Sequence, residues 1–148
     1  MGRTPAVTES IRPADPGDAE LLVPLFEQLG YPTSADEIRA RLEAASEHST
    51  VLLAMRGSRA IGFAAVGVAE DLIVGRRGVV LGLVVDESAR SGGVGARLLD
   101  DAERWAFARG AVAMMVRSNV IRERAHGFYE RKGYRRVKSQ HVFGKRRT

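Results

Sequence analysis

The chain has 148 residues, 45% of them hydrophobic, and a formal net charge of +5. That length suits one domain over residues 1–148, and the apolar content argues against a disordered chain. Cysteine is absent, which excludes disulfides, thiolate metal sites and a cysteine nucleophile. No apolar run approaches the roughly 20 residues of a membrane span, and residues 1–6 lack the apolar core of a secretory signal, so we expect a soluble cytoplasmic protein.

The charge and the histidines limit the kinds of ligand. His48, His126 and His141 stand too far apart in the sequence for metal-ligand spacing, so we expect no metal site. Residues 117–148 contain eleven Lys or Arg and two Glu, a net charge of +9 that leaves −4 for the rest of the chain. Such a segment is typical of proteins that bind an anionic ligand or a nucleic acid, and a solvated basic surface is the alternative.

Hydrophobic periodicity and turn residues predict a mixed α/β fold with the element order β-α-α-β-β-β-α-β-α-β-β. The expected elements are strand 8–12, helices 15–29 and 34–45, strands 50–55, 60–68 and 79–85, helix 93–108, strand 111–116, helix 119–132, and closing strands 134–137 and 142–145. The run 79–85 is apolar on both faces and should be a central strand. The β-α-β unit that follows should place residues 111–116 in the same sheet.

Several element boundaries carry specific signals. Asp15 with Pro16 is typical of a helix start, and Pro24 predicts a kink or break in that helix. Ser34 with Glu37 matches a capping box at the start of the next helix. Glycine-containing turns are expected at 56–59 and 75–78, and two further glycines are expected to end helices, namely Gly110 and Gly133.

The most informative segment is LVVDESARSGGVGARLL, residues 83–99, in which an apolar strand runs into a glycine-dense turn and then a helix. The first turn of a helix has unpaired N–H groups and a positive dipole end, so it suits a phosphate. Gly92, Gly93 and Gly95 let the backbone approach such a ligand closely. Arg90 adds a positive charge and a planar fork of donors.

Three kinds of phosphate loop compete for this segment. A P-loop requires a lysine after its glycines, and none follows here. A dinucleotide fingerprint requires a third glycine and the first strand of its unit, and neither condition is met. The pattern R-x-x-G-x-G/A fits Arg90, Gly93 and Gly95, and a glycine-rich connection without a ligand is the remaining alternative.

Two phrases of the sequence resemble motifs of the GNAT family of N-acetyltransferases. Residues 83–99 are similar to that family's acetyl-CoA motif. The phrase SNVIRERAHGFYERKGY resembles its second motif, and the matching positions are Asn119, Ala125, Tyr129 and Gly133. The two motifs span about residues 79–134, and the element order of the whole chain agrees with the acyl-CoA N-acyltransferase (GNAT) fold.

The resemblance implies an acetyl-CoA-dependent N-acetyltransferase and assigns its cofactor contacts. The strand end at Leu83, Val84 and Val85 would pair with the pantetheine arm like an added strand, and Asn119 would also contact that arm. Tyr129 would protonate the departing thiolate, and a packing role in the core is the alternative. The pyrophosphate would be bound by the backbone amides of Arg90, Ser91, Gly92, Gly93, Val94, Gly95 and Ala96.

The general base is the point at which this sequence departs from the family. Many members place a glutamate on the first-motif strand, whereas residues 79–82 contain no acid. Glu70, Asp71 or a water chain would then have to deprotonate the amine. Direct attack by the amine in a ternary complex is expected, and the missing glutamate keeps a non-catalytic acyl-CoA sensor as an alternative.

The acceptor stays open at this level. The resemblance places an acceptor pocket near residues 27–33, where Glu27 and Tyr31 are candidate contacts, and it implies a homodimer. A small molecule or a protein is the expected carrier of the acceptor amine, and the basic C-terminal segment motivates RNA as the alternative carrier. Arg122 and Arg124 would reach the 3′-phosphate or adenine of CoA, or else form solvated helix surface.

Overall fold

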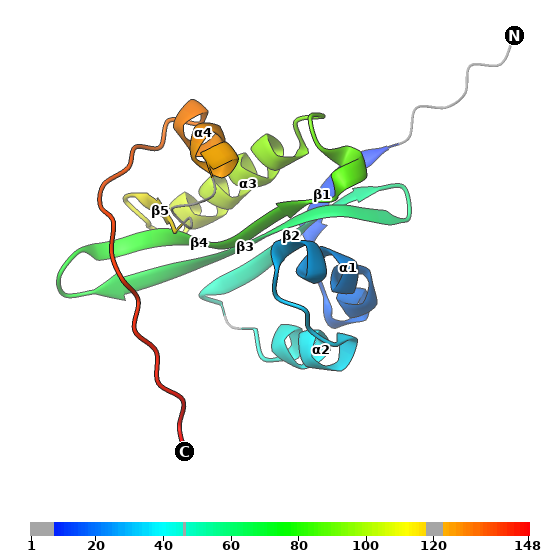
Figure 1. The fold of residues 1–148 in the computed structure, drawn as a ribbon, viewed down its shortest axis with the longest axis horizontal. Coiled ribbons are helices and arrows are strands. Elements are labelled where there is room, and N and C mark those ends of the chain that lie inside the picture. The colour runs from blue at the N-terminus through cyan, green and yellow to red at the C-terminus, as the bar shows by residue number, and fades with distance from the viewer. Residues whose placement is uncertain (1–7, 46, 118–122) are drawn as a thin grey trace, which may run out of the picture. The chain divides into compact units, whose positions relative to one another are not determined.

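The computed structural model describes residues 8–45, 47–117 and 123–148. The chain divides into two compact units, residues 1–116 and 117–148, and each is described by itself. The first unit is a five-stranded mixed sheet with helices on both faces, as Figure 1 shows. The predicted mixed α/β class is therefore confirmed.

The order of the elements along the chain is close to the predicted order. In the first unit they are β1 (Glu9–Pro13), the short 3₁₀ helix η1 (Pro16–Asp18), α1 (Ala19–Leu29), α2 (Ala35–Glu43), β2 (Ser49–Arg56), β3 (Arg59–Asp71), β4 (Gly75–Val85), the 3₁₀ helix η2 (Glu87–Ala89), α3 (Val94–Ala108) and β5 (Met114–Val116). In the second unit the described helix is α4 (Glu123–Arg131).

The strands lie side by side in the order β1-β2-β3-β4-β5. The first four are antiparallel to their neighbours, whereas β5 runs parallel to β4 because α3 carries the chain back between them. The predicted β-α-β unit is thus confirmed, with β4 and β5 in one sheet.

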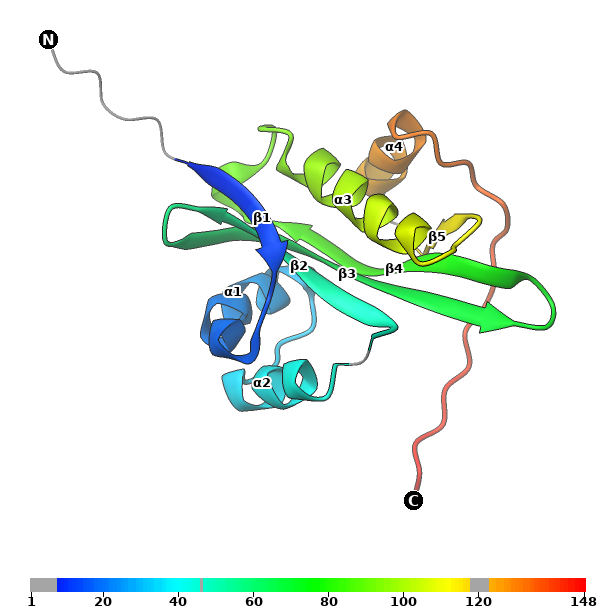
Figure 2. The ribbon, with the colours of Figure 1, turned by 180° about the vertical axis from the view of Figure 1, so that it is seen from behind.

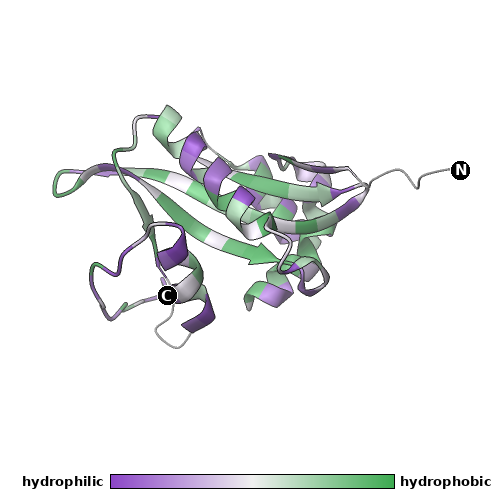
Figure 3. Cartoon of the chain, turned by 90° about the horizontal axis from the view of Figure 1, so that it is seen from above, coloured by the Kyte–Doolittle hydropathy of each residue, from purple (hydrophilic) through white to green (hydrophobic). Residues whose placement is uncertain are grey.

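Each face of the sheet has its own hydrophobic core, and the two views of the ribbon show α1 and α2 on one face and α3 on the other (Figures 1 and 2). In Figure 3 the strands are mostly hydrophobic while the helices carry both kinds of residue, as expected for elements with one buried face. The core under α1 and α2 contains, among others, Leu22, Leu25, Ile38, Leu53 and Phe63. The core under α3 contains, among others, Ile61, Val66, Leu98, Ala102 and Ala106.

The predicted caps are present. Asp15 accepts a hydrogen bond from the N–H of Gly17 at 2.8 Å and caps η1, which leads directly into α1. The hydroxyl of Ser34 accepts from the N–H of Glu37 at 3.2 Å at the start of α2. Pro24 lies inside α1, and the helix continues past it to Leu29, so the predicted break is absent.

Two differences from the predicted boundaries concern the strands around the candidate site. The prediction of a turn at residues 75–78 is wrong. β4 begins at Gly75, and the turn before it comprises Leu72, Ile73 and Val74. Asp71 explains the difference, since its carboxylate accepts the N–H groups of Ile73 and Val74, each at 2.8 Å, and closes the turn there. The expected strand 111–116 is shorter and covers only Met114–Val116.

The two closing strands at 134–137 and 142–145 are also wrong, because residues 134–148 carry no strand. Val137, Val142 and Phe143 are 72%, 80% and 92% exposed. A strand requires a neighbour for its hydrogen bonds, and closely spaced basic residues in this stretch repel one another. Apolar residues at strand-like positions were the only signal for these elements.

Candidate functional site

The edge of β4 opens halfway along the strand. β4 pairs with β3 along its whole length, but it pairs with β5 only at Gly78, Val79 and Val80. Beyond Val80, within the part of the chain that the structure describes, residues 81–85 have no second strand beside them. Apart from the carbonyl of Val85, which accepts from Arg90, their outward backbone groups are therefore available to an extended ligand that adds to the sheet edge.

A β-bulge marks the point at which β4 opens. Ala65 lies opposite Gly82 while Val66 lies opposite Val80, so Leu81 is an extra residue in β4. Bulges bend a strand, increase its twist and re-aim side chains. The side chain of Leu81 is 65% exposed. The pairing with β5 thus ends next to a local bend in β4.

The glycine-dense turn carries the chain from η2 into α3. Ser91 and Gly93 both adopt left-handed backbone angles, with φ of 73° and 80°. The amide N–H groups of residues 91–96 find no acceptor among the residues that the structure describes. Because these amides sit at the positive end of the 15-residue helix α3, the turn presents donors that suit a phosphate.

Arg90 is fixed at the base of this turn. Its Nε donates to the carbonyl oxygen of Val85 at 3.1 Å, which holds the exposed guanidinium beside the end of β4. The structure therefore brings together most of the residues predicted to bind the cofactor, since the strand end, the turn and the first turn of α3 are continuous. These residues are Leu83, Val84, Val85, Arg90, Ser91, Gly92, Gly93, Val94, Gly95 and Ala96.

Asp86 is the centre of a hydrogen-bond network that the sequence interpretation missed. Its carboxylate accepts from Gln28 Nε2 at 2.8 Å, from Arg59 at 2.9 Å and from the N–H of Ser88 at 3.0 Å. It also accepts from the Ser88 hydroxyl. The Ser88 hydroxyl and the Gln28 amide lower the pKa of Asp86 to about 2. The spacing of Asp86 and Ser88 was a local signal, whereas nothing in the sequence pointed to Gln28 or Arg59.

The two acids proposed as a general base already have structural partners. Glu70 accepts from Arg76 at 2.6 and 3.1 Å. Asp71 caps the β3–β4 turn and pairs with Arg77 at 3.7 Å. The hydrogen bond from the N–H of Val74, above all, lowers the pKa of Asp71. A depressed pKa weakens a carboxylate as a base, so this geometry favours a structural role for Asp71.

The acceptor-side residues lie at the end of α1. Tyr31, just beyond that helix, is 69% exposed. A Cβ on Gly82 would lie 3.3 Å from Cδ2 of Leu29, so the last turn of α1 rests on β4 next to the bulge. Glu27 is an exposed residue in the same turn of α1. The predicted acceptor region and the open half of β4 are therefore neighbours.

The remaining predicted residues lie in the second unit or outside the described residues. Asn119 and Arg122 lie outside the described residues. Tyr129 lies on α4 in the second unit, where its ring makes edge-to-face contacts with Phe128 and Tyr134 at centroid distances of 5.3 and 5.9 Å. Its expected role as the acid stays a prediction.

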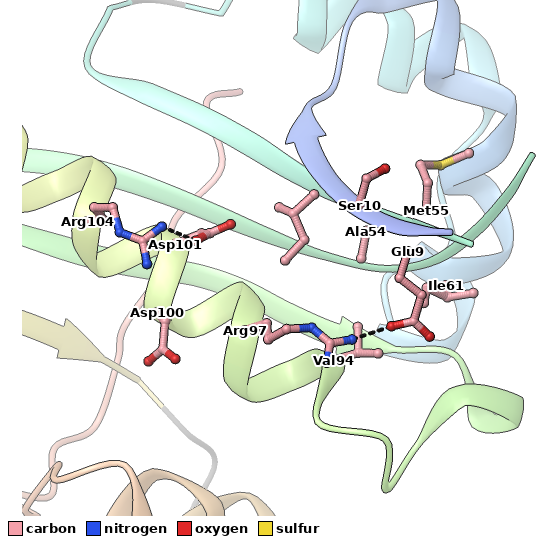
Figure 4. A pocket seen from close by; sticks show the side chains of 11 residues that line it. Glu9, Ser10, Ala54, Met55, Ile61, Val94, Arg97, Asp100, Asp101 and Arg104 are labelled. Carbon is pink, nitrogen blue, oxygen red and sulfur yellow. Dashed lines mark hydrogen bonds and ion pairs between the residues drawn. The ribbon is translucent and has the colours of Figure 1, made fainter. Parts of the chain in front are cut away.

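A cavity of about 310 Å³ lies between β1 and α3, and Val94 and Arg97 from the first turn of α3 are among its lining residues (Figure 4). Glu9 at its edge pairs with Arg56 at 2.7 Å and also with Arg97, and the Arg56 hydrogen bond lowers the pKa of Glu9. Asp101 pairs with Arg104 along the same wall. These charges satisfy one another, so the cavity offers an anionic cofactor less than the turn before α3 does.

Neither a metal centre nor a membrane span is found among the described residues. In residues 8–45, 47–117 and 123–148, no three His, Asp or Glu side chains gather closely enough to hold a metal ion. Over the same ranges, no helix is long and apolar enough to cross a membrane.

Comparison with known proteins places this geometry in a family. Residues 19–134 match the model of the Acetyltransferase (GNAT) family. The chain is 31% identical over 134 residues to a Bacillus subtilis (strain 168) protein named uncharacterized N-acetyltransferase YhfO, a match that covers 84% of this chain and 89% of the relative.

Solved structures agree on the fold. Aminoglycoside N-acetyltransferase AAC(6')-Iy in complex with CoA superposes with a TM-score of 0.86 at 22% identity, covering 99% of each chain. Glucosamine-6-phosphate N-acetyltransferase from Arabidopsis thaliana gives a TM-score of 0.80 at 18% identity, covering 93% of this chain and 98% of the other. At these identities the likeness establishes the fold and leaves the acceptor undecided.

Proposed function

Because the chain belongs to the GNAT family of acetyl-CoA-dependent N-acetyltransferases, we propose that it transfers the acetyl group of acetyl-CoA to a primary amine by direct attack. The observation that carries this proposal is that an open strand edge is followed closely in the chain by a turn whose amides have no acceptor among the described residues. Residues 81–85 supply the edge and residues 91–96 supply the amides, and the chain between them is short.

The cofactor would bind in two parts. Its pantetheine arm would add to the free edge of β4 at Leu83, Val84 and Val85, with Asn119 as a further contact. Its pyrophosphate would lie on the amides from Ser91 to Ala96, next to the guanidinium of Arg90. The resulting position of the thioester is next to the bulge at Leu81, where the two strands part.

The reaction forms one bond and breaks another. The neutral amine attacks the thioester carbonyl carbon, a C–N bond forms, and the C–S bond breaks to release the thiolate of CoA. The amine must first lose its proton, since a lysine-like amine has a pKa of about 10.4. We assign that proton to a water chain, because Glu70 and Asp71 are engaged at the β3–β4 turn. Tyr129 is the proposed donor to the thiolate, and the proton that the nitrogen loses as the amide forms would return through water to the Tyr129 phenolate.

The acceptor region is proposed at the end of α1, around Glu27 and Tyr31, because this end rests on β4 beside the bulge. AAC(6')-Iy has also been solved with a bisubstrate analogue, CoA-S-monomethyl-acetylneamine. An aminoglycoside-like polyamine is therefore one acceptor to screen, together with amino sugars and peptide amines. A homodimer remains a family expectation that light scattering would test.

The cofactor proposal is tested by thermal unfolding with acetyl-CoA, CoA, NAD and ATP at equal concentrations. A ligand at 100 times its dissociation constant adds about 2.7 kcal/mol of stability. For a chain of this length that corresponds to roughly 5–10 °C in Tm. We expect the two CoA species to raise Tm and NAD and ATP to leave it within about 1 °C.

A screen of amines for thiol release separates the enzyme from the sensor. Turnover with any amine supports the transferase. CoA binding without turnover across the panel would favour the acyl-CoA sensor, and no shift with either CoA species would remove the cofactor proposal.

A further inference from the structure

The side chain of Asp86 joins segments that are far apart in the sequence. One carboxylate oxygen, Oδ1, accepts from Gln28 Nε2 at 2.8 Å, across a separation of 58 residues. The other, Oδ2, accepts from Arg59 at 2.9 Å, from the start of β3. The side chain of Asp86 is only 17% exposed. Asp86 directly follows β4, so its side chain connects the end of that strand to α1 and to β3.

Gln28 binds the same segment with both ends of its amide. While its Nε2 donates to Asp86, its Oε1 accepts from the N–H of Glu87 at 3.2 Å. These two bonds fix the orientation of the amide, since exchanging its N and O atoms would break both. Gln28 lies in the last turn of α1, three residues before Tyr31. It thus ties the acceptor-side end of α1 to the chain that leaves β4.

Asp86 also shapes the backbone that leads to the phosphate-binding turn. Its carboxylate caps η2 through the N–H of Ser88, and its carbonyl accepts from the N–H of Ala89 at 2.9 Å. Arg90 comes next and is the first residue of the turn. A shift at Asp86 would therefore move the start of the turn that presents the amides of residues 91–96.

We propose that Gln28 and Asp86 form a positioning clamp, which holds the CoA-binding turn in its binding form and ties it to the acceptor-side end of α1. The inference rests on the proposed function, because it assigns the turn to CoA. Gln28 and Asp86 bond to each other and to the N–H groups of Glu87 and Ser88, so both would act through the backbone that they hold. Groups held by several hydrogen bonds keep a site in the geometry that its ligand needs.

Protonation does not switch the clamp at working pH. The pKa of Asp86 is about 2, lowered first by the Ser88 hydroxyl and then by the Gln28 amide, so the carboxylate is ionised throughout the neutral range. An amide at position 86 removes that charge and can accept through only one oxygen. Asp86→Asn therefore weakens the clamp with little change in volume.

The first experiment measures CoA affinity by titration calorimetry at pH 7.5 on the full chain. Wild type is compared with Gln28→Ala, Asp86→Asn and the double variant. We expect each single change to weaken binding by about tenfold, the equivalent of losing one hydrogen bond to a charged group. The double variant should be no more than about twofold worse than the weaker-binding single variant, because both changes disable one clamp.

The matched control is Asp101→Asn. Asp101 also pairs with an arginine, Arg104, but it lies on α3 along the wall of the cavity between β1 and α3. Its change should leave CoA affinity within twofold of wild type. Loss of affinity in this variant too would mean that any missing carboxylate on this unit weakens binding, which contradicts a specific clamp.

A pH profile separates the clamp from general destabilisation. Gln28→Glu places a second carboxylate against Asp86, and a neighbouring like charge raises the pKa of the introduced group above its usual value of about 4.3. CoA affinity of this variant should be poorest at pH 8 and recover by about fivefold or more toward pH 5, relative to wild type at each pH. Gln28→Ala, which adds no charge, should show no such recovery.

Amide hydrogen exchange tests the clamp without any ligand. In Gln28→Ala the amides of Glu87, Ser88 and Ala89, which donate to Gln28 and Asp86, should exchange several-fold faster than in wild type, while those of β2 stay unchanged. If wild type itself fails to bind CoA, the proposed function is wrong and exchange still decides the clamp. The clamp is overturned if Gln28→Ala is folded, exchanges like wild type at these residues and binds CoA within twofold.

Discussion

The two halves of β4 differ in how completely neighbouring parts of the protein satisfy their backbone hydrogen-bonding groups. In the first half, residues 75–80, β3 pairs with the whole stretch and β5 pairs with residues 78–80. The turn before it is closed by Asp71 and by the pairs Glu70–Arg76 and Asp71–Arg77. In the second half, residues 81–85, one edge has no neighbouring strand among the described residues, and the amides of the following turn have no acceptor there. Within one strand, the half that has its partners supports the fold, and the other half is the one that we propose to bind the cofactor.

The largest loss of stability should come from adding a bulky side chain in the first half of β4, residues 75–80. A Cβ on Gly78 would collide with the Sδ of Met114 and would lie 2.7 Å from Cβ of Ala106, so β5 and α3 both press on this position. Gly78→Val should cost about 2–3 kcal/mol in the free energy of unfolding, as for other overpacked cores. Urea unfolding would measure it.

Gly144→Val is the control for Gly78→Val, because nothing lies within 4 Å of the added Cβ at that position. It should change the free energy of unfolding by less than about 0.5 kcal/mol. CoA affinity of folded Gly78→Val should stay within threefold of wild type. A tenfold loss of affinity would show that the two halves of β4 are not separable.

The next effect contrasts two glycines with the same backbone conformation. Gly93 precedes α3 with a φ of 80°, and Gly75 begins β4 with a φ of 78°. A β-branched residue at either position costs about 1–2 kcal/mol of backbone strain. We expect Gly93→Val and Gly75→Val to lose similar stability, whereas only Gly93→Val should also lose CoA affinity, by at least tenfold.

Paired measurements of urea unfolding and CoA titration on both variants test this contrast. Equal losses of affinity in both would contradict the division of β4. Unchanged affinity in Gly93→Val would remove the turn from the binding site.

The pH dependence of stability should reveal Asp86. Its folded pKa of about 2 lies below the ordinary value of 3.8, so its contribution to stability is fully present above about pH 4 and is lost as the pH falls toward 2. The stability difference between wild type and Asp86→Asn should therefore shrink over that range. Urea midpoints at pH 2.5, 3.5, 5 and 7 would measure it, and a difference that does not vary with pH would contradict the network.

The smallest effect should come from the exposed pair at the closed turn. Glu70 and Arg76 lie 2.6 Å apart with side chains 61% and 43% exposed, and such surface pairs contribute about 0–1 kcal/mol. Glu70→Gln should change the free energy of unfolding by no more than that. It should leave the turnover number of an amine found by screening within threefold between pH 6 and 9.

Asp71→Asn is the companion variant to Glu70→Gln, because Asp71 was the other acid considered as a base. It should lower stability by more than Glu70→Gln does, since it disturbs the cap of the turn. Loss of the acidic limb of the pH–rate profile, with turnover down a hundredfold in either variant, would identify a side-chain base and replace the water chain.

The sequence alone determined the features that depend on neighbours in the chain. The caps at Asp15 and Ser34 were predicted because they act over two or three residues. The succession of a strand, a glycine-dense turn and a helix was also predicted, and the two motifs identified the family. Such signals are readable because each is complete within a short stretch of chain.

Only the tertiary structure decided where strand pairing begins and ends. The bulge at Leu81, the end of the β4–β5 pairing at Val80 and the link between Gln28 and Asp86 all depend on residues brought together from distant parts of the chain. The two incorrect closing strands failed for the same reason. A strand or a long-range hydrogen bond exists only when its partner is in place, and sequence spacing does not specify that partner.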